Sequence, residues 1–253
     1  MEQQLHDQLN ALNLRYLRDN WDDLVRDATR TKPSYHRFLA DILATECHAR
    51  QEHLRLARLK RARIPEPLAM ETFPFALQPK LDKRKILDLY DSRRFISEAQ
   101  VMLFIGPTGC GKTGLATAFL IHAINNNLRA RFIDFKDLTA RLYQSIADHT
   151  ERALIKHFAA WDCLLIDELG YAPLEKRQAG LLFDLLRHRH NKHCTIITTQ
   201  LGLSEWPALL GDEHLSAAII DRITENCTVF NMAKCVSIRR KNITHLTQGA
   251  DSP

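Results

Sequence analysis

One stretch constrains the fold of this chain more than any other, the segment over residues 101–113. It begins with five apolar residues, 101–105, and continues as Gly-x-x-x-x-Gly-Lys-Thr from Gly106 to Thr113. Apolar residues then recur at helical spacing over 115–121. A glycine-rich loop between a strand and a helix is the P-loop pattern, in which backbone N–H groups surround a polyphosphate. The alternative, an ordinary glycine-rich turn, does not require this strand-loop-helix context.

Each residue type in this loop has a chemical reason to be there. The glycines let main-chain N–H groups point at phosphate oxygens, Lys112 brings a positive charge to the outer phosphates, and Thr113 can offer a hydroxyl to Mg²⁺. We therefore predict ATP and Mg²⁺ as the cofactors. The predicted nucleotide-binding residues of the loop are Gly106, Pro107, Thr108, Gly109, Cys110, Gly111, Lys112, Thr113 and Gly114.

A second motif stands where apolar residues 163–166 end in Asp167 and Glu168. A buried strand that ends in adjacent carboxylates is the Walker B pattern, with Asp167 facing Mg²⁺ and Glu168 facing the attacking water. Alone, such a pair is more often a helix cap, but here it follows a P-loop. The strand expected over 194–200 ends in polar residues that would lie level with the terminal phosphate. We predict Lys112, Asp167, Glu168, Thr199 and Gln200 as catalytic residues, and Thr113 and Asp167 as Mg²⁺ ligands.

Strands and helices alternate after residue 100, which predicts an α/β fold with a parallel sheet. Before residue 65 the apolar residues recur at helical spacing, over 5–27 and again from Pro33 to about residue 63. Prolines interrupt the chain between these two regions. We expect a helical domain over 1–64, a linker over 65–80, an ATPase domain over 81–246 and a flexible tail over 247–253.

The end of the second predicted helix is strongly basic and contains a single acid, Glu52. Arg55, Arg58 and Arg61 follow one another at intervals of three and therefore lie near one face of the helix. One interpretation is a DNA-binding surface, and the other is a solvated face at a helix C-terminus, where cations are favoured anyway. The predicted DNA-binding residues are Arg50, Arg55, Arg58, Lys60, Arg61 and Arg63.

Composition limits the class of protein. The 253 residues are 45% hydrophobic, which allows a full core, and the formal net charge of +5 favours a polyanionic partner. The six cysteines form no C-x-x-C pair, so we interpret them as reduced core residues. No signal peptide or apolar run of membrane-spanning length is evident, so we expect a cytoplasmic protein.

Taken together, the motifs resemble those of AAA+ ATPases of the initiator and helicase-loader group, and most closely the IstB-like transposition helper ATPases. The resemblance covers nearly the whole chain. It implies an AAA+ core with a parallel five-stranded sheet between helices, and a small all-α N-terminal domain. It further implies that residues 198–200 form sensor I, that Arg222 is an arginine finger supplied to a neighbouring subunit, and that Arg239 lies in the sensor II region. Besides the P-loop and Walker B, the motifs that carry it are residues 165–171, Ser204-Glu205-Trp206, Asp221-Arg222 and Ser237-Ile238-Arg239.

By this resemblance, the chain is expected to be an ATP-dependent, DNA-binding homo-oligomer. It would select and bend target duplex DNA with little sequence preference, and it would recruit or stimulate a cognate transposase. ATP hydrolysis would drive disassembly. A replicative helicase loader of the same fold is one alternative, and a metabolite kinase is another. The alternative for Arg222 is a surface arginine paired with Asp221.

Several positions depart from the pattern of this family. Gln200 stands where Asn is usual, Gly114 where His is usual, and Pro74 where Asp is usual. The longer side chain of Gln200 displaces its amide by one methylene, so we expect slow turnover. Arg189-His190-Asn191 replaces an Arg-Tyr-Glu triplet.

Overall fold

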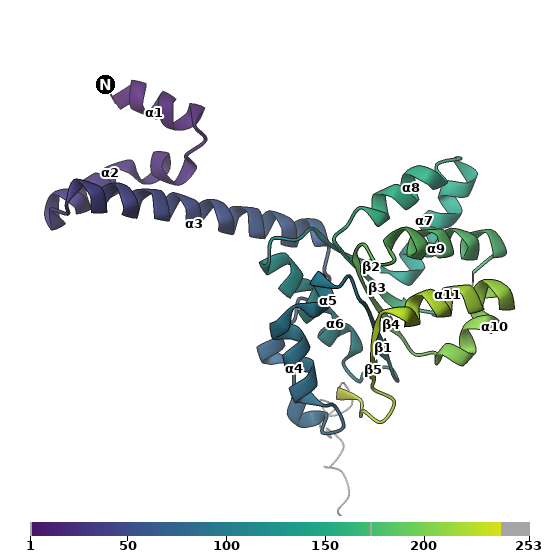
Figure 1. Ribbon diagram of the computed structural model, residues 1–253. Coiled ribbons are helices and arrows are strands. Elements are labelled where there is room, and N and C mark those ends of the chain that lie inside the picture. The colour runs from purple at the N-terminus through teal and green to yellow at the C-terminus, as the bar shows by residue number, and fades with distance from the viewer. Residues whose placement is uncertain (1, 173, 239–253) are drawn as a thin grey trace, which may run out of the picture. The chain divides into compact units, whose positions relative to one another are not determined.

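The computed structural model describes residues 2–172 and 174–238 (Figure 1). Contacts between Cα atoms divide the chain into two compact units, residues 1–58 and 59–253. We call these unit 1 and unit 2. Arg239 and the tail expected over 247–253 lie outside the described residues. Among the described residues, no helix combines the length and the apolar character needed to cross a membrane.

Unit 1 is helical, as the spacing of its apolar residues predicts. It contains α1 (Glu2–Ala11), α2 (Arg15–Thr31) and the first part of α3 (Tyr35–Ala62). The region of helical spacing over 5–27 is interrupted between α1 and α2 at Asn13, which has a φ of 56°. Leu9, Leu17 and Ile42 form the small core, and the buried Glu46 accepts a hydrogen bond of 2.9 Å from the Leu17 N–H in the first turn of α2.

Unit 2 contains a five-stranded sheet in the order β2-β3-β4-β1-β5, and all of its strand pairs are parallel. The structure therefore confirms the predicted α/β class. Most of the strand residues are buried, which is why these strands read as apolar runs in the sequence. The strands are β1 (Val101–Ile105), β2 (Ala130–Asp134), β3 (Cys163–Leu169), β4 (Cys194–Thr199) and β5 (Cys227–Asn231).

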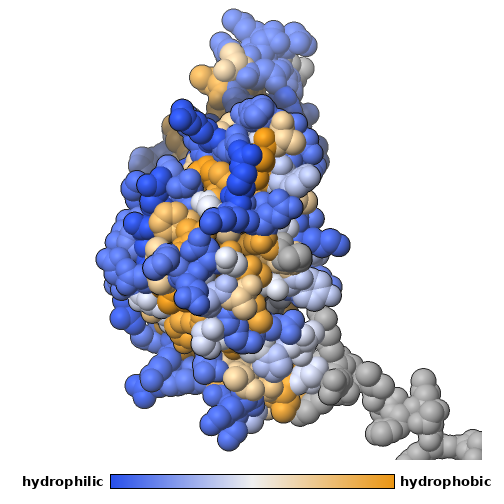
Figure 2. Space-filling view, turned by 90° about the vertical axis from the view of Figure 1, so that its right-hand side faces the viewer, coloured by the Kyte–Doolittle hydropathy of each residue, from blue (hydrophilic) through white to orange (hydrophobic). Residues whose placement is uncertain are grey.

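Helices cover both faces of this sheet, and each face has its own hydrophobic core (Figure 1). One core contains Phe104, Phe119 and Phe230, and the other contains Leu103, Phe135 and Trp206. Figure 2 shows hydrophobic residues in small groups between hydrophilic ones on the surface that it displays. The helices of the first face are α4 (Lys83–Ser92), α5 (Arg94–Ser97) and α6 (Lys112–Asn125); those of the second are α7 (Phe135–Ala147), α8 (Glu151–Ala159), α9 (Lys176–Arg189), α10 (Trp206–Leu210) and α11 (Glu213–Glu225).

The segment expected as a linker, residues 65–80, is a packed part of unit 2. It contains two short 3₁₀ helices, η1 (Met70–Thr72) and η2 (Phe75–Leu77). Met70 and Phe73 are buried in the core on the α6 face. The prolines prevent a long helix here, but they do not prevent the apolar side chains between them from packing. The boundary between the compact units accordingly falls at residue 58 and not at residue 64.

Candidate nucleotide-binding site

The P-loop connects β1 to α6 at the carboxyl edge of the sheet, where ligands of open α/β sheets bind. Gly109 and Gly111 adopt left-handed conformations, with φ of 81° and 97°. Gly106 is required for a different reason. A Cβ atom at this position would lie 2.8 Å from the Cβ of Met232 and 2.9 Å from its carbonyl group. The backbone N–H of Met232 donates a hydrogen bond of 2.6 Å to Ile105, so this close approach continues the pairing of β1 with β5.

Lys112 lies inside the loop that precedes it. Its Nζ donates hydrogen bonds to the carbonyl oxygens of Gly106, at 2.7 Å, and Pro107, at 2.9 Å. Only 7% of Lys112 is exposed, so the surrounding loop fixes the position of its ammonium group. The oxygens of a bound polyphosphate would compete with these two carbonyls for the same N–H groups.

Asp167, at the end of β3, receives hydrogen bonds from two threonine hydroxyls. Thr113 Oγ1 lies 3.0 and 3.1 Å from the two carboxylate oxygens, and Thr198 Oγ1 donates to Oδ1 at 2.5 Å. Burial raises the pKa of Asp167, the two hydroxyls oppose this shift, and the charges of Glu168 and Asp134 add to it. Among the residues that the structure describes, no basic group contributes to this pKa shift.

The oxygens of Thr113 and Asp167 suit Mg²⁺, which takes one or two carboxylate ligands from a protein and completes its shell with water and substrate phosphates. The direct hydrogen bond between the two side chains shows that both can approach one ion. The described residues contain no cluster of three or more His, Cys, Asp or Glu that could bind a metal without such a substrate.

Glu168 adopts a left-handed conformation with a φ of 58°, which is uncommon for a residue other than glycine. Its backbone N–H donates a hydrogen bond of 2.9 Å to Thr198 Oγ1. The pairing of β3 with β4 is irregular between Ile166 and Leu169, so Glu168 lies where the regular ladder is interrupted. The strained backbone places Glu168 in the wall of the nucleotide cavity, and such strain concentrates at functional sites.

The end of β4 differs from the prediction in one respect. Thr199 is fully buried, and its hydroxyl donates to the carbonyl of Leu169 at 2.7 Å, which is a structural contact at the strand end. The preceding Thr198 contacts the carboxylate of Asp167, so the hydroxyls of both threonines contact residues of β3. The sequence shows two adjacent threonines, but it does not show which of them contacts the Asp167 carboxylate. Gln200 is exposed and borders the cavity, as expected.

A cavity of about 420 Å³ opens in front of the P-loop. The sequence did not predict the apolar wall of this cavity, because the wall is formed by residues of the expected linker and by residues at the end of the described chain. A Cβ on Gly111 would lie 3.1 Å from both Phe73 and Ile238, and a Cβ on Gly114 would lie 3.3 Å from Leu68. The cavity is lined by Glu66, Pro67, Leu68, Phe73, Pro74, Thr108, Gly109, Gly111, Lys112, Thr113, Gly114, Glu168, Thr199, Gln200 and Ile238.

Gln78 connects three segments around this cavity. It is 1% exposed, and its Nε2 donates to the carbonyls of Cys110, at 3.0 Å, and Val236, at 2.6 Å. Its Oε1 accepts a hydrogen bond of 3.1 Å from the Val236 N–H. Two residues further on, the Ile238 N–H donates to Gly109 at 2.8 Å. A single amide side chain therefore ties residues 65–80 and the C-terminal segment to the P-loop.

The remaining predicted residues lie elsewhere. Arg222, on α11, places its guanidinium 4.9 Å from the ring centroid of Phe183 and does not line the cavity of its own chain. Among the described residues, Arg222 forms no ion pair with Asp221. Arg55 is paired with Glu52 at 2.7 Å. Arg50, Arg55 and Arg58 belong to unit 1, and Lys60, Arg61 and Arg63 belong to unit 2.

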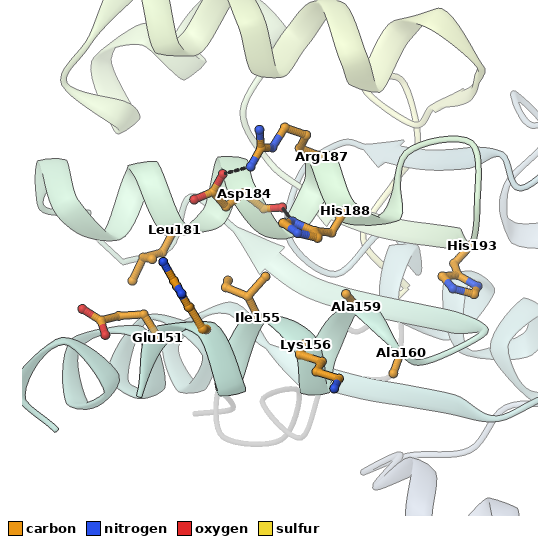
Figure 3. Close-up of a pocket in the computed structure, with 11 residues that line it drawn as sticks. Glu151, Ile155, Lys156, Ala159, Ala160, Leu181, Asp184, Arg187, His188 and His193 are labelled. Carbon is orange, nitrogen blue, oxygen red and sulfur yellow. Dashed lines mark hydrogen bonds and ion pairs between the residues drawn. The ribbon is translucent and has the colours of Figure 1, made fainter. Parts of the chain in front are cut away.

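A second cavity, of about 660 Å³, lies between α8 and α9 (Figure 3). Its wall includes Ile155 and Leu181, together with the charged residues Glu151, Arg152, Lys156, Asp184 and Arg187. Arg187 forms an ion pair of 2.9 Å with Asp184, and Glu151 pairs with Arg177 at 3.4 Å. None of the lining residues belongs to the P-loop or to the Walker B strand.

Comparison with known proteins agrees with this geometry. Residues 7–245 match the family model described as IstB-like ATP binding protein. The chain is 30% identical, over 91% of its length and 92% of the relative, to the insertion sequence IS232 putative ATP-binding protein of Bacillus thuringiensis subsp. berliner. It is also 30% identical, over 88% of its length and 84% of the relative, to the insertion sequence IS21 putative ATP-binding protein of Pseudomonas aeruginosa.

Solved structures show the same fold at low sequence identity. AMPPCP-bound DnaA from Aquifex aeolicus aligns with a TM-score of 0.55 and 14% identity, covering 72% of this chain and 56% of that one. The DnaC helicase loader aligns with a TM-score of 0.50 and 24% identity, covering 68% of this chain and 95% of that one. These likenesses confirm the AAA+ fold predicted from the sequence.

Proposed function

The chain belongs to the family of IstB-like ATP binding proteins, and we propose that it is a Mg²⁺-dependent ATPase that prepares duplex DNA for a transposase. The observation that carries the ATPase proposal is that Lys112, Thr113 and Glu168 line one cavity at the carboxyl edge of the sheet, with Asp167 hydrogen-bonded to Thr113. The insertion-sequence relatives support the role in transposition.

In this proposal each side chain of the site has one task. Lys112 exchanges its carbonyl partners for phosphate oxygens when ATP binds. Thr113 and Asp167 hold Mg²⁺, which would neutralise charge that develops on the phosphates. Glu168 accepts a proton from the attacking water. Leu68, Phe73 and Ile238 supply an apolar wall for the nucleoside.

Two substitutions test the ATPase proposal. Lys112→Ala removes the charge that meets the outer phosphates, so ATP binding should be lost. Glu168→Gln retains the shape of the side chain but removes the proton acceptor, so ATP should still bind while hydrolysis stops. Binding of a fluorescent ATP analogue and release of phosphate measure the two effects. The Glu168 assignment is wrong if Glu168→Gln hydrolyses ATP at the wild-type rate.

We further propose that ATP assembles the chain into a homo-oligomer on duplex DNA, with Arg222 facing the nucleotide of a neighbouring subunit. The position of Arg222 outside its own nucleotide cavity supports an action in trans. Hydrolysis would then disassemble the oligomer. A set of subunits could also meet the cost of bending DNA, which is of the order of 1–6 kcal/mol for a smooth bend of 40–90° over 20–30 base pairs.

The alternative within this fold is a helicase loader, which the likeness to the DnaC helicase loader brings into consideration. No aromatic residue interrupts the basic sequence from Arg50 to Arg63, whereas binders of single strands usually place stacking aromatics among their cations. We therefore expect the protein with a non-hydrolysable ATP analogue to prefer duplex over single-stranded DNA and to shorten a doubly labelled duplex. A preference for single strands without shortening favours the loader.

A further inference from the structure

A group of basic side chains surrounds Arg131 at the amino edge of the sheet, opposite the nucleotide cavity. Arg131 is the second residue of β2, and only 8% of it is exposed. Its Nη1 donates a hydrogen bond of 2.9 Å to the carbonyl oxygen of Arg61, and its guanidinium carbon lies 5.9 Å from the ring centroid of Trp161. The Nε of Arg131 and the indole N–H of Trp161 are buried and have no hydrogen-bond partner in the described part of the chain.

The charges that act on Arg131 are cationic. Burial lowers the pKa of Arg131, and the positive charges of Arg63 and Arg141 lower it further. Burial likewise lowers the pKa of the nearby His157, again with Arg131 and Arg141 as the charged contributors. Within residues 2–172 and 174–238, no ion pair includes Arg61, Arg63, Arg131 or Arg141.

Burying the guanidinium of Arg131 near other positive charges costs free energy when no ligand is bound. A buried charge requires either a counter-ion or a full set of hydrogen bonds, and Arg131 has one hydrogen bond and repulsive neighbours. Its contacts with Arg61 and Trp161 nevertheless fix where the guanidinium lies. A fixed guanidinium flanked by exposed arginines is suited to an anion with several acceptor oxygens, above all a phosphate.

We propose that Arg131, together with Arg63 and Arg141, forms a second phosphate-binding site that holds a backbone phosphate of duplex DNA. We call these three residues the Arg131 cluster. The inference deepens the proposed DNA-binding function and rests on it. Continuity favours DNA as the source of the phosphate, because Arg61 and Arg63 already belong to the basic stretch predicted to contact DNA. ATP is a poorer candidate, since its site lies at the opposite edge of the sheet.

The two kinds of arginine have different roles in this site. Arg131 is oriented before DNA arrives, so it positions the phosphate at little cost in side-chain entropy. Arg63 and Arg141 are exposed and add charge. No part of the Arg131 cluster reads a base edge, so it contributes affinity without sequence preference.

The salt dependence of duplex binding tests this proposal. Fluorescence anisotropy of a labelled duplex is measured with the full chain and a non-hydrolysable ATP analogue, at salt concentrations from 50 to 200 mM. Arg141→Gln removes one exposed cation, and Arg131→Met removes the buried charge while nearly keeping its volume. Arg187→Gln is the matched control, because it removes the same charge from an arginine that Asp184 already neutralises.

We expect each of the two test variants to bind several duplex sequences more weakly and to lower the log–log salt slope by about one. The loss of affinity between 50 and 200 mM salt should then be about fourfold smaller than in the wild type. The control should keep the wild-type slope. If both test variants keep the wild-type salt slope, the proposal that the Arg131 cluster binds a DNA phosphate is wrong. If Arg131→Met does not fold, the salt slope of Arg141→Gln alone tests the proposal. Absence of duplex binding by the wild type would instead refute the proposed function itself.

Discussion

Two buried arginines, Arg189 and Arg131, differ in whether the chain satisfies them. Arg189 is 1% exposed, and burial lowers its pKa to about 10, yet its donors are directed at acceptors from two segments of the chain, residues 158–161 and 194–195. Arg131 is almost as buried and contacts a single carbonyl. The acceptors of Arg189 are the carbonyl oxygens of Phe158, Ala159, Trp161 and Cys194 and the hydroxyl of Thr195.

This difference separates an arginine that stabilises the fold, Arg189, from one to which we assign a ligand, Arg131, at the same edge of the sheet. The hydrogen bonds of Arg189 join the end of α8 to the starts of β3 and β4, so its desolvation is offset within the fold. The desolvation of Arg131 is not offset in this way, which is why we assign it a ligand. Whether a buried arginine has a ligand is therefore best inferred from its N–H donors without acceptors and from the sign of the neighbouring charges, and not from its burial alone.

The largest expected effect concerns a third arginine, Arg222, whose guanidinium lies 4.9 Å from the ring centroid of Phe183 and forms no ion pair with any described residue. If it serves a neighbouring subunit, Arg222→Ala should reduce kcat by about 10³–10⁵-fold, as for other arginine fingers. Mixing Arg222→Ala with Lys112→Ala should restore activity at mixed interfaces, since each variant supplies what the other lacks. Phosphate release from the mixture, compared with the separate variants, measures this. If the activity of the mixture is only the sum of the activities of the two separate variants, Arg222 has a structural role and does not act on a neighbouring subunit.

The next effect is on folding stability. Arg189→Met leaves several buried carbonyls without a donor, and each such group costs about 1–3 kcal/mol. We expect the free energy of unfolding to fall by more than about 3 kcal/mol, measured by urea denaturation. Arg131→Met, the matched change, should leave stability unchanged or increased, because it removes a charge whose burial is not offset. If both substitutions lower the free energy of unfolding equally, the proposed difference between Arg189 and Arg131 is wrong.

The smallest effect is at the carboxyl edge, where Asp167 is also a buried charge and forms no ion pair with any residue that the structure describes. Its pKa is raised in the folded state, so the carboxylate destabilises the nucleotide-free protein once the pH exceeds that pKa. Asp167→Asn should therefore stabilise the nucleotide-free protein at neutral pH by about 0.5–2 kcal/mol while abolishing hydrolysis.

The pH dependence distinguishes this cause from a packing effect. The stability advantage of Asp167→Asn should shrink as the pH falls toward the ordinary Asp value, because the wild-type carboxyl becomes neutral there. Thermal unfolding at several pH values without nucleotide provides the measurement. A constant advantage at all pH values would exclude the charge as its origin.

The sequence predicts the parts of the site that lie on contiguous motifs. Lys112 and Thr113 follow from the loop pattern, and Asp167 and Glu168 from the end of a buried strand. Thr198 could not be separated from Thr199, because the hydroxyls of both contact β3 and only the fold shows which of them meets the Asp167 carboxylate. The roles of Gln78, Arg131 and Arg189 depend on contacts with distant segments, and an isolated polar residue in a sequence carries no sign of such contacts. Four of the strands were predictable because they are mostly buried and appear as apolar runs, whereas β5 is largely exposed or half-buried.

The contacts of Gln78 have a consequence for how the protein is made. Gln78 meets Cys110 across 32 positions of the chain and Val236 across 158. Closing the longer loop costs about 1.4 kcal/mol more chain entropy than closing the shorter one. We therefore expect Gln78 to contact the P-loop early in folding, and the C-terminal segment to dock on it late. During synthesis on a ribosome, the nucleotide cavity would remain without one wall until the segment around Val236 and Ile238 has emerged.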